Sequence, residues 1–188
     1  MLSDFQKSKL DRRFELLDTD GDGYISGADY DAAAANVCRA FDHPQDSPQY
    51  EKVQMAYLNL WVRLSKPMDK AGAGRISRKQ FVASCAERIV EAEDGYERIV
   101  APIIQAIFDV VDADGSGTLD IEELTTWFSA YGVCTDDAER VFKQLDRDEN
   151  GVLDHDEIQR AVREFYTGDD PKAPGSLLYG PLPVSVRR

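Results

Sequence analysis

Histidine, cysteine and methionine are scarce in this chain of 188 residues, which contains two, three and three of them, respectively. His43 and His155 lie far apart in the sequence and form no credible catalytic pair, so we expect no enzyme. Cys38, Cys85 and Cys134 show no CxxC pair, which argues against a sulfur-ligated metal site and suits a reducing compartment. We expect all three to be small buried apolar side chains.

Positive charge is also in short supply. With 22 Lys and Arg against 35 Asp and Glu, the formal charge is −13, and such a surface repels nucleic-acid phosphates and anionic lipid heads. No uninterrupted apolar stretch approaches the roughly 18 residues of a membrane span, and the opening segment MLSDFQKSKLDRRF is too charged for a signal peptide. We therefore expect a cytoplasmic monomer with neither nucleic acid nor membrane as a partner.

What the sequence does contain is a repeated acidic segment. Three copies occur, DTDGDGYISGAD at residues 18–29, DADGSGTLDIEE at 112–123 and DRDENGVLDHDE at 146–157. Each places side-chain oxygens at positions 1, 3 and 5, glycine at 6, an aliphatic residue at 8 and a carboxylate at 12, which is the pattern of an EF-hand calcium loop. Oxygens on alternate residues converge on one ion, and glycine at position 6 permits the sharp turn that this requires.

This pattern assigns the metal ligands, with position 7 contributing its backbone carbonyl. The expected ligands are Asp18, Asp20, Asp22, Tyr24 and Asp29; Asp112, Asp114, Ser116, Thr118 and Glu123; and Asp146, Asp148, Asn150, Val152 and Glu157. Asp29 is one methylene shorter than the usual glutamate, and contact through one oxygen lowers the coordination number towards the six that magnesium demands. We expect three calcium sites, with magnesium competing at the first or calcium binding more weakly there. The alternative is an inward shift of the following helix with no functional change.

A fourth copy, DKAGAGRISRKQ at residues 69–80, is incomplete. Positions 3, 5 and 12 are occupied by Ala71, Ala73 and Gln80, where a calcium loop needs charged or polar oxygens. We expect it not to bind calcium, and a chance resemblance in a Gly-Ala loop is the alternative. EF-hands usually occur in pairs whose position 8 residues form a short antiparallel bridge. On this basis Ile76 is expected to pair with Ile25, and Leu119 with Leu153, so that the second loop braces the first.

Apolar residues at helical spacing flank each loop. The sequence therefore predicts an all-α fold, with four helix-loop-helix units in two pairs that form one compact body and short antiparallel bridges between paired loops. Ser3 with Gln6 predicts a capping box at the first helix, and Ser47 followed by Pro48 predicts another helix start. Pro102 either kinks its helix or marks where that helix begins.

The spacing of the loops divides the chain. The first and second loops start 51 residues apart and the third and fourth only 34, with a join near residues 93–95. We expect an N-terminal pair at 1–93, a C-terminal pair at 94–167 and a Pro/Gly-rich tail at 168–188. The apolar residues of the tail are Leu177, Leu178, Tyr179, Leu182 and Val184. Part of the tail is expected to pack across the helices; a disordered extension is the alternative.

Residues 3 to about 166 resemble the EF-hand superfamily, and within it the sarcoplasmic calcium-binding proteins and bacterial calerythrin. The resemblance rests on three complete loops, one degenerate second loop and the long first pair. It implies four EF-hands with sites one, three and four active and a compact aromatic core that joins both halves. It also implies a cytosolic calcium buffer or transport protein.

Two other functions fit the same loops less well. A calcium sensor of the calmodulin type exposes a methionine-rich groove to a protein partner, and only Met1, Met55 and Met68 occur here. A photoprotein of the coelenterazine type shares the pattern of three active sites and one degenerate site. It needs histidines around its luciferin and a C-terminal proline, whereas this chain has two histidines and ends in Arg-Arg. The buffer is therefore favoured, and the photoprotein is a remote alternative.

Overall fold

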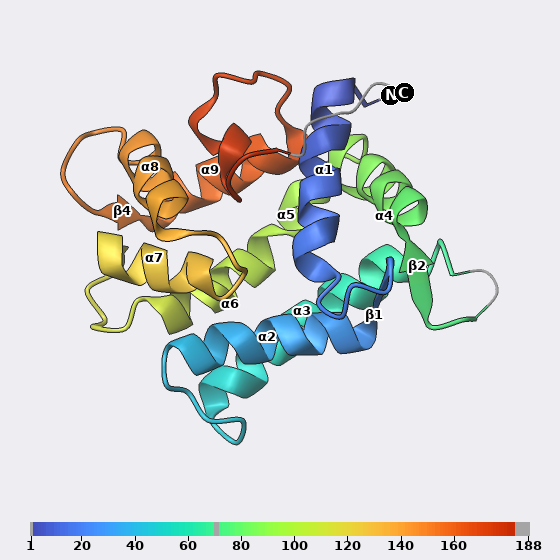
Figure 1. Ribbon diagram of the computed structural model, residues 1–188, viewed down its shortest axis with the longest axis horizontal. Coiled ribbons are helices and arrows are strands. Elements are labelled where there is room, and N and C mark those ends of the chain that lie inside the picture. Colours follow the sequence, from blue (N-terminus) through green and yellow to red (C-terminus); the bar gives the residue numbers. More distant parts are fainter. Residues whose placement is uncertain (1, 70–71, 183–188) are drawn as a thin grey trace.

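The computed structural model of the protein describes residues 2–69 and 72–182, which fold mainly into helices (Figure 1). The α-helices are α1 (Asp4–Leu17), α2 (Gly27–Ala40), α3 (Pro48–Ser65), α4 (Arg78–Cys85), α5 (Gly95–Ile99), α6 (Ala101–Val111), α7 (Ile121–Ser129), α8 (Thr135–Leu145) and α9 (His155–Thr167). A π-helical turn, η1 (Ala86–Val90), extends α4, and a 3-10 turn, η2 (Pro174–Leu177), follows α9. The short strands are β1 (Tyr24–Ser26), β2 (Arg75–Ser77), β3 (Thr118–Leu119) and β4 (Leu153–Asp154). The predicted all-α fold with helix-loop-helix units is confirmed.

The loops are joined in pairs by two short antiparallel bridges. Ile25 of β1 lies opposite Ile76 of β2, and Leu119 of β3 lies opposite Leu153 of β4. All four side chains are fully buried, so each bridge is also part of the apolar core. Both predicted pairings are confirmed, including the one that involves the incomplete second loop.

The predicted helix starts are confirmed by their hydrogen bonds. The backbone N–H of Gln6 donates to Ser3 Oγ (3.0 Å), and the N–H of Ser3 donates to Gln6 Oε1 (3.0 Å), which is a capping box at α1. Ser47 caps α3, whose first residue is Pro48. Pro102 lies in the first turn of α6, so it marks a helix start and does not kink a continuous helix.

The chain reverses direction between η1 and α5. Asp94 takes a left-handed conformation (φ 53°), and a Cβ at Gly95 would lie 2.5 Å from the carbonyl oxygen of Arg88. Only glycine fits such a close approach of two backbone segments. The domain boundary between residues 93 and 94 stays a prediction.

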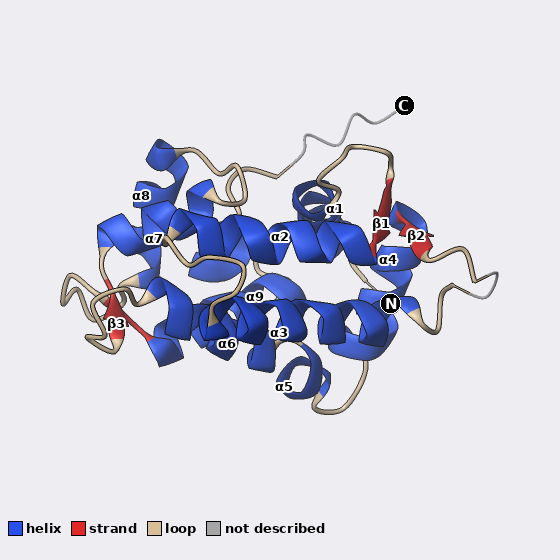
Figure 2. Cartoon of the chain, turned by 90° about the horizontal axis from the view of Figure 1, so that it is seen from below, coloured by secondary structure: helices blue, strands red, loops and turns tan. Residues whose placement is uncertain are grey.

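Both halves of the chain share one core. Helix α3 contacts α6, α1 contacts α9 and α2 contacts α7, and Figure 2 shows α3 beside α6 along one side of the molecule. The buried apolar cluster contains residues from each of these helices. Cys38 and Cys85 belong to it, whereas Cys134 is exposed at the start of α8, so the prediction that all three cysteines are buried was wrong.

The first part of the tail packs against the helical body. Leu178 and Tyr179 are almost completely buried, and Arg12 Nε of α1 donates a hydrogen bond to the carbonyl oxygen of Tyr179 (3.0 Å). The backbone N–H of Gly175 donates to Glu164 of α9 (3.0 Å). The predicted packing of the tail is thus confirmed as far as residue 182, and Val184 lies outside the described residues.

Lys9 joins α1 to the end of α9. The side chain is fully buried, and its Nζ donates to the carbonyl oxygens of Glu164 (2.8 Å) in the last turn of α9 and of Gly168 (2.7 Å), the residue that follows this helix. Burial lowers the pKa of Lys9 to about 8, although the carboxylates of Asp169 and Glu164 favour the charged form.

A second buried cation lies among aromatic rings. Arg13 of α1 is 3% exposed, and its guanidinium carbon lies 5.1 Å from the ring centre of Tyr131 and 4.8 Å from that of Tyr179. Its Nε donates to the hydroxyl of Tyr166 (3.2 Å), and the hydroxyls of Tyr57 and Tyr131 are hydrogen-bonded to each other. Ring faces and hydroxyls from α3, α9, the turn after α7 and the tail therefore stabilise this charge.

These tyrosines predict how stability responds to alkaline pH. Burial raises the pKa of Tyr57, Tyr166 and Tyr179 above the ordinary value of 10.0, and the opposing effect of Arg13 is smaller. At a pH between the tyrosine pKa of the unfolded chain and the raised pKa of the folded chain, the unfolded chain binds fewer protons than the folded chain. The free energy of unfolding should therefore fall above about pH 10, by about 1.4 kcal/mol per pH unit for each such tyrosine.

Urea unfolding measured at several pH values between neutrality and strong alkali checks this expectation. The Tyr57→Phe variant should show a shallower alkaline loss than the parent protein. Tyr24→Phe, at a ring that is 38% exposed, is the matched control and should leave the slope unchanged. An equal alkaline slope in Tyr57→Phe and the parent would contradict the assignment.

Candidate metal centre

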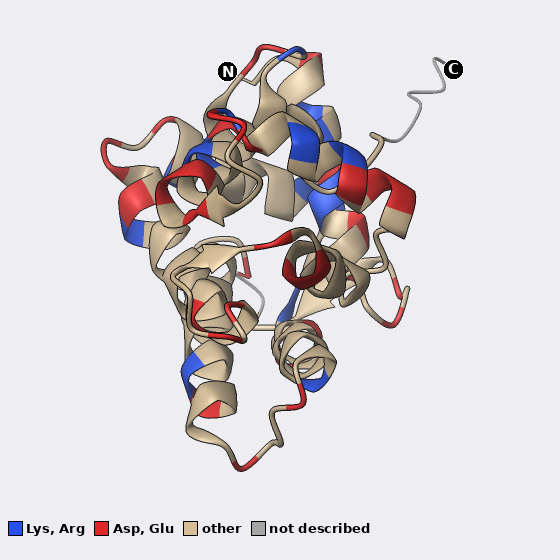
Figure 3. Cartoon of the chain, turned by 90° about the vertical axis from the view of Figure 1, so that its left-hand side faces the viewer, with Lys and Arg blue, Asp and Glu red and all other residues tan. Residues whose placement is uncertain are grey.

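Carboxylate side chains converge at three places in the described part of the chain. The groups are Asp18, Asp20 and Asp22; Asp112, Asp114 and Glu123; and Asp146, Asp148 and Glu157. Within each group, one oxygen from each residue lies within 4.8 Å of the others. Figure 3 shows Asp and Glu on loops at the edge of the molecule, and Asp20, Asp114 and Asp148 are exposed. The first, third and fourth loops each hold one group, as the sequence predicts.

Position 1 of each loop is fixed from two directions. Its backbone N–H closes the preceding helix, as Asp18 does on the carbonyl oxygen of Phe14 (2.9 Å). Its side chain accepts a hydrogen bond from the position 6 glycine, whose φ is positive. These bonds run from Gly23 to Asp18 (3.0 Å, φ 83°), Gly117 to Asp112 (2.9 Å, φ 81°) and Gly151 to Asp146 (3.0 Å, φ 86°). The glycine conformation therefore sets the direction of the first carboxylate.

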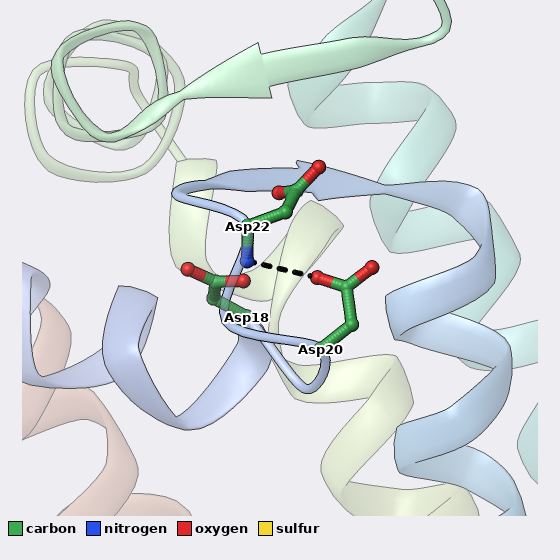
Figure 4. Close-up of side chains that lie close together, drawn as sticks. All are labelled: Asp18, Asp20 and Asp22. Atoms are coloured by element: carbon green, nitrogen blue, oxygen red, sulfur yellow. Dashed lines mark hydrogen bonds between the residues drawn. The ribbon is translucent and has the colours of Figure 1, made fainter.

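The first loop gathers three aspartates around its turn (Figure 4). The N–H of Asp22 donates to Asp20 Oδ1 (3.1 Å), and the N–H of Tyr24 donates to Asp22 Oδ1 (2.8 Å). Such bonds hold three like charges close together although they repel one another. One divalent cation relieves this repulsion.

Asp29 lies outside the first carboxylate group. It is 4% exposed, and its two oxygens accept four hydrogen bonds, from the N–H and hydroxyl of Thr19 (3.0 and 2.9 Å) and of Ser26 (both 2.8 Å). Burial acts to raise the pKa of Asp29, but these bonds outweigh it and the pKa is lowered. Its assignment as a ligand stays a prediction, and the geometry makes the first site different from the other two.

The longer glutamates at position 12 do join their groups. Glu123 accepts hydrogen bonds from the N–H of Ala113 (2.8 Å) and of Asp120 (3.0 Å), which begins α7. Glu157 does the same with the N–H groups of Arg147 (2.9 Å) and Asp154 (3.2 Å). Each glutamate therefore belongs both to a capping box and to a carboxylate group, because its extra methylene lets it reach both.

The remaining predicted ligands lie along the same loops. The N–H of Ser116 donates to Asp112 and Asp114 (both 2.9 Å), and the bond to Asp114 lowers the pKa of that carboxyl. Asn150 donates in the same way to Asp146 (3.0 Å) and Asp148 (3.2 Å). The position 7 residues are Tyr24 and Thr118, which open β1 and β3, and Val152, which precedes β4.

The second loop keeps the fold of the others without their charge. The N–H of Gly74 donates to Asp69 Oδ2 (2.7 Å), as in the other loops. Gln80 accepts from the N–H of Ser77 (2.9 Å) and donates to the carbonyl oxygen of Met68 (2.9 Å). A neutral amide thus performs the capping role of position 12. Among the described residues of this loop there is no cluster of three carboxylates like those of the other loops.

Arg75 of the second loop reaches the first site, which the sequence analysis missed. Its Nη1 lies 3.4 Å from Asp22 Oδ2, and its guanidinium carbon lies 4.1 Å from the ring centre of Tyr24. Both side chains of the ion pair are about half exposed, so the attraction is screened by water. The sequence does show that Arg75 is a cation in the second loop, which pairs with the acidic first loop. Which residue of the first loop it contacts depends on the register of β1 and β2.

Family profiles agree with these loops. The profile of the EF-hand domain pair matches residues 103–163, and an EF-hand profile matches residues 10–30. The chain therefore contains EF-hands in both of these segments. EF-hand loops bind calcium through the oxygen ligands at the positions described above, and three loops here retain them, so it is a calcium-binding protein.

Similar proteins extend over most of the chain. Calerythrin of Saccharopolyspora erythraea is 27% identical over 169 residues, which are 89% of this chain and 96% of calerythrin. A Streptomyces coelicolor calcium-binding protein has a similar structure, with a TM-score of 0.76, 27% identity and coverage of 88% of this chain and 99% of that chain. The predicted resemblance to the calerythrin type is confirmed.

A photoprotein is also similar. The magnesium-loaded ctenophore apo-berovin has a TM-score of 0.66 and 27% identity, covering 84% of this chain and 86% of its own. All three calcium-binding loops of berovin bind magnesium ions. Among the described residues of the chain, none of the helices is long and apolar enough to cross a membrane.

Replacing Arg75 should strengthen the first site. In a background where Glu123→Gln and Glu157→Gln disable the other sites, Arg75→Gln should raise calcium affinity about two- to fivefold, because an exposed ion pair contributes up to about 1 kcal/mol. Isothermal titration calorimetry measures this change. Arg78→Gln is the control and should leave calcium affinity unchanged, because the ion-pair partners of Arg78 are Asp11 and Glu15 of α1, which are not metal ligands. Unchanged or weaker binding in Arg75→Gln would refute a competing role for this arginine.

Proposed function

We propose that the protein is a calcium buffer that stores ions in three EF-hand loops. The observation that carries the proposal is the convergence of carboxylates in the first, third and fourth loops, where N–H groups of the same loop already direct them. A loop that is ordered in this way loses little further entropy when it takes an ion. Three divalent ions add six positive charges and bring the formal charge from −13 to −7.

The proposed ligands are those that the loop pattern assigns. They are Asp18, Asp20, Asp22, the Tyr24 carbonyl and Asp29; Asp112, Asp114, Ser116, the Thr118 carbonyl and Glu123; and Asp146, Asp148, Asn150, the Val152 carbonyl and Glu157. For Asp29 the proposal requires that its carboxylate exchange part of its hydrogen bonding for the ion. Magnesium is expected to compete best at this first site.

Packing favours a buffer over a protein that opens on binding. The helices that leave the third and fourth loops bury large aromatic side chains, with Trp127, Phe128 and Phe165 at most 1% exposed. Opening would expose these rings, and methionine, which adapts to varied partners, is nearly absent from the core. We assign no catalytic role. We also propose that the protein is a monomer and that it is cytoplasmic, the latter because free thiols suit a reducing compartment.

A regulatory role is the second candidate. The Streptomyces coelicolor protein to which this chain is similar is described as acting in calcium-mediated regulation. A regulator needs a surface that differs between its calcium-loaded and calcium-free forms. The two candidates therefore differ in how much apolar surface calcium exposes.

Calorimetric titration should give three calcium ions per chain. Glu123→Gln and Glu157→Gln should each remove one ion from the stoichiometry, because each loses one of the charged ligands of its loop. Gln80→Glu is the matched control and should still bind three, since positions 3 and 5 of the second loop remain alanine. The same titration with magnesium present should show competition mainly at the first site, and Asp29→Glu should shift that site towards calcium. Two ions in the parent protein would remove the first site from the proposal.

Chelating calcium should lower the melting temperature. Filling one site at about 100 times its dissociation constant adds roughly 2.7 kcal/mol of folded-state stability, which corresponds to roughly 5–10 °C for a chain of this size. Differential scanning calorimetry with calcium and with EGTA measures the shift. A melting temperature that ignores the chelator would argue against linked binding and folding.

The same samples distinguish a buffer from a regulator. An anionic apolar dye, anilinonaphthalene sulfonate, should fluoresce no more strongly with calcium than with EGTA if the core stays closed. A large rise on adding calcium would favour regulation by an exposed apolar surface.

A further inference from the structure

A groove of about 410 Å³ lies between α3 on one side and α5 and α6 on the other. Figure 2 shows these three helices next to one another. The floor of the groove is apolar and consists of the buried side chains of Leu60, Ile99, Ile103 and Ala106. None of the residues that line it belongs to a metal loop, so this surface is separate from the calcium sites.

The apolar surface continues along α3 beyond this groove. A second hollow is lined by Val62, Arg63 and Lys66, and Arg63 lines both hollows. Met55 and Val62 are 54% and 52% exposed, the highest values for large hydrophobic side chains in the described part of the chain. They are seven residues apart and therefore lie on the same face of the helix. We call the two hollows together the α3–α6 groove.

The rim of the α3–α6 groove is positively charged. Lys52, Arg63 and Arg98 line the first hollow, Arg88 and Lys66 line the second, and no Asp or Glu lines either. Lys52 forms an ion pair with Asp109 of α6. Arg63, Lys66 and Arg98 have no carboxylate within ion-pair distance among residues 2–69 and 72–182. Unpaired cations are thus concentrated along one strip of a chain whose formal charge is −13.

We propose that the α3–α6 groove docks an amphipathic helix from a partner protein, with its apolar stripe on the floor of the groove and Glu or Asp along its edges. An apolar floor provides affinity, and the flanking cations provide orientation and selection against basic partners. The partner expected here is acidic, so its charge has the same sign as the net charge of this chain. Local complementarity at the groove must therefore outweigh overall repulsion.

Charge and shape argue against other occupants. Residues 183–188 (PVSVRR) carry two arginines and no acidic residue, so the end of this chain has the same charge as the rim. A flat anionic bilayer meets the acidic remainder of the surface and does not reach a floor whose side chains are almost completely buried. A narrow helix lies along the groove and the exposed side chains of Met55 and Val62, so it covers less of the acidic surface than a flat bilayer does.

Two synthetic peptides test the proposal on the full-length, calcium-saturated protein. Each is a fluorescently labelled helix of about 18 residues with leucine on one face, carrying glutamate on the other face in one peptide and lysine in the matched peptide. Fluorescence anisotropy at physiological salt should show about tenfold tighter binding of the glutamate peptide. Because overall charge alone favours the lysine peptide, equal binding or a preference for lysine would overturn the proposal.

Charge-reversal variants locate the binding surface. Arg63→Glu and Arg98→Glu should each weaken the glutamate peptide about tenfold, and Met55→Glu should also weaken it. Lys79→Glu makes the same charge change at an exposed position of α4 outside the groove and should bind as the parent does. Loss of affinity in Lys79→Glu as large as in Arg98→Glu would show a bulk charge effect and reject the groove.

Two further measurements separate the other occupants. In one outcome the parent protein cosediments with phosphatidylserine vesicles, loses this binding in Arg98→Glu, and fails to bind the glutamate peptide. This result would identify a lipid surface as the occupant of the groove and overturn the proposal. Sedimentation equilibrium that shows a parent dimer and an Arg98→Glu monomer would make the groove a contact between two copies and overturn it likewise. A parent protein that is monomeric and does not bind vesicles but binds the glutamate peptide supports it.

Discussion

Hydrogen bonds from backbone N–H groups to loop carboxylates are the interaction on which the rest of this structure depends. Position 1 accepts from position 6, and position 12 accepts from position 9, so like charges stay close despite their repulsion. The same residues also end one helix and begin the next. In these three loops the direction of the helices and the placement of the carboxylates are therefore set by the same hydrogen bonds.

The second loop separates two roles that the other loops combine. Gln80 still accepts the hydrogen bond that begins α4, but an amide carries no charge for a cation. Ile76 still bridges to Ile25, so the pair retains its geometry. In place of a site, this loop supplies Arg75, which lies against the carboxylate of Asp22. A loop that has lost its ligands thus acts on the neighbouring site through charge.

Local signals predicted most of the fold, because each depends on residues that are close in the sequence. The capping box of Ser3 and the helix start at Pro48 are of this kind, and so are the loops with their alternate oxygens. Apart from the two bridges between paired loops and the packing of the tail, contacts between distant segments were not predicted. The tyrosines around Arg13 and the cationic rim between α3 and α6 depend on how helices pack, which no short pattern records. Cys134 was misplaced for the same reason, since only the fold shows that it begins α8 at the surface.

The contacts between α1 and the tail have a consequence for biosynthesis. Lys9 and Arg12 leave the ribosome 159 and 167 residues before Gly168 and Tyr179, to whose backbone oxygens they donate hydrogen bonds. The rings that surround Arg13 include one from the same late segment. Until that segment has been made, the first helix lacks the carbonyl acceptors of Lys9 and one of the rings around Arg13, so its full burial comes late in folding. The amino-terminal half alone supplies the contacts of α1 with α4, including Phe14 against Phe81, but leaves Lys9 without its acceptors.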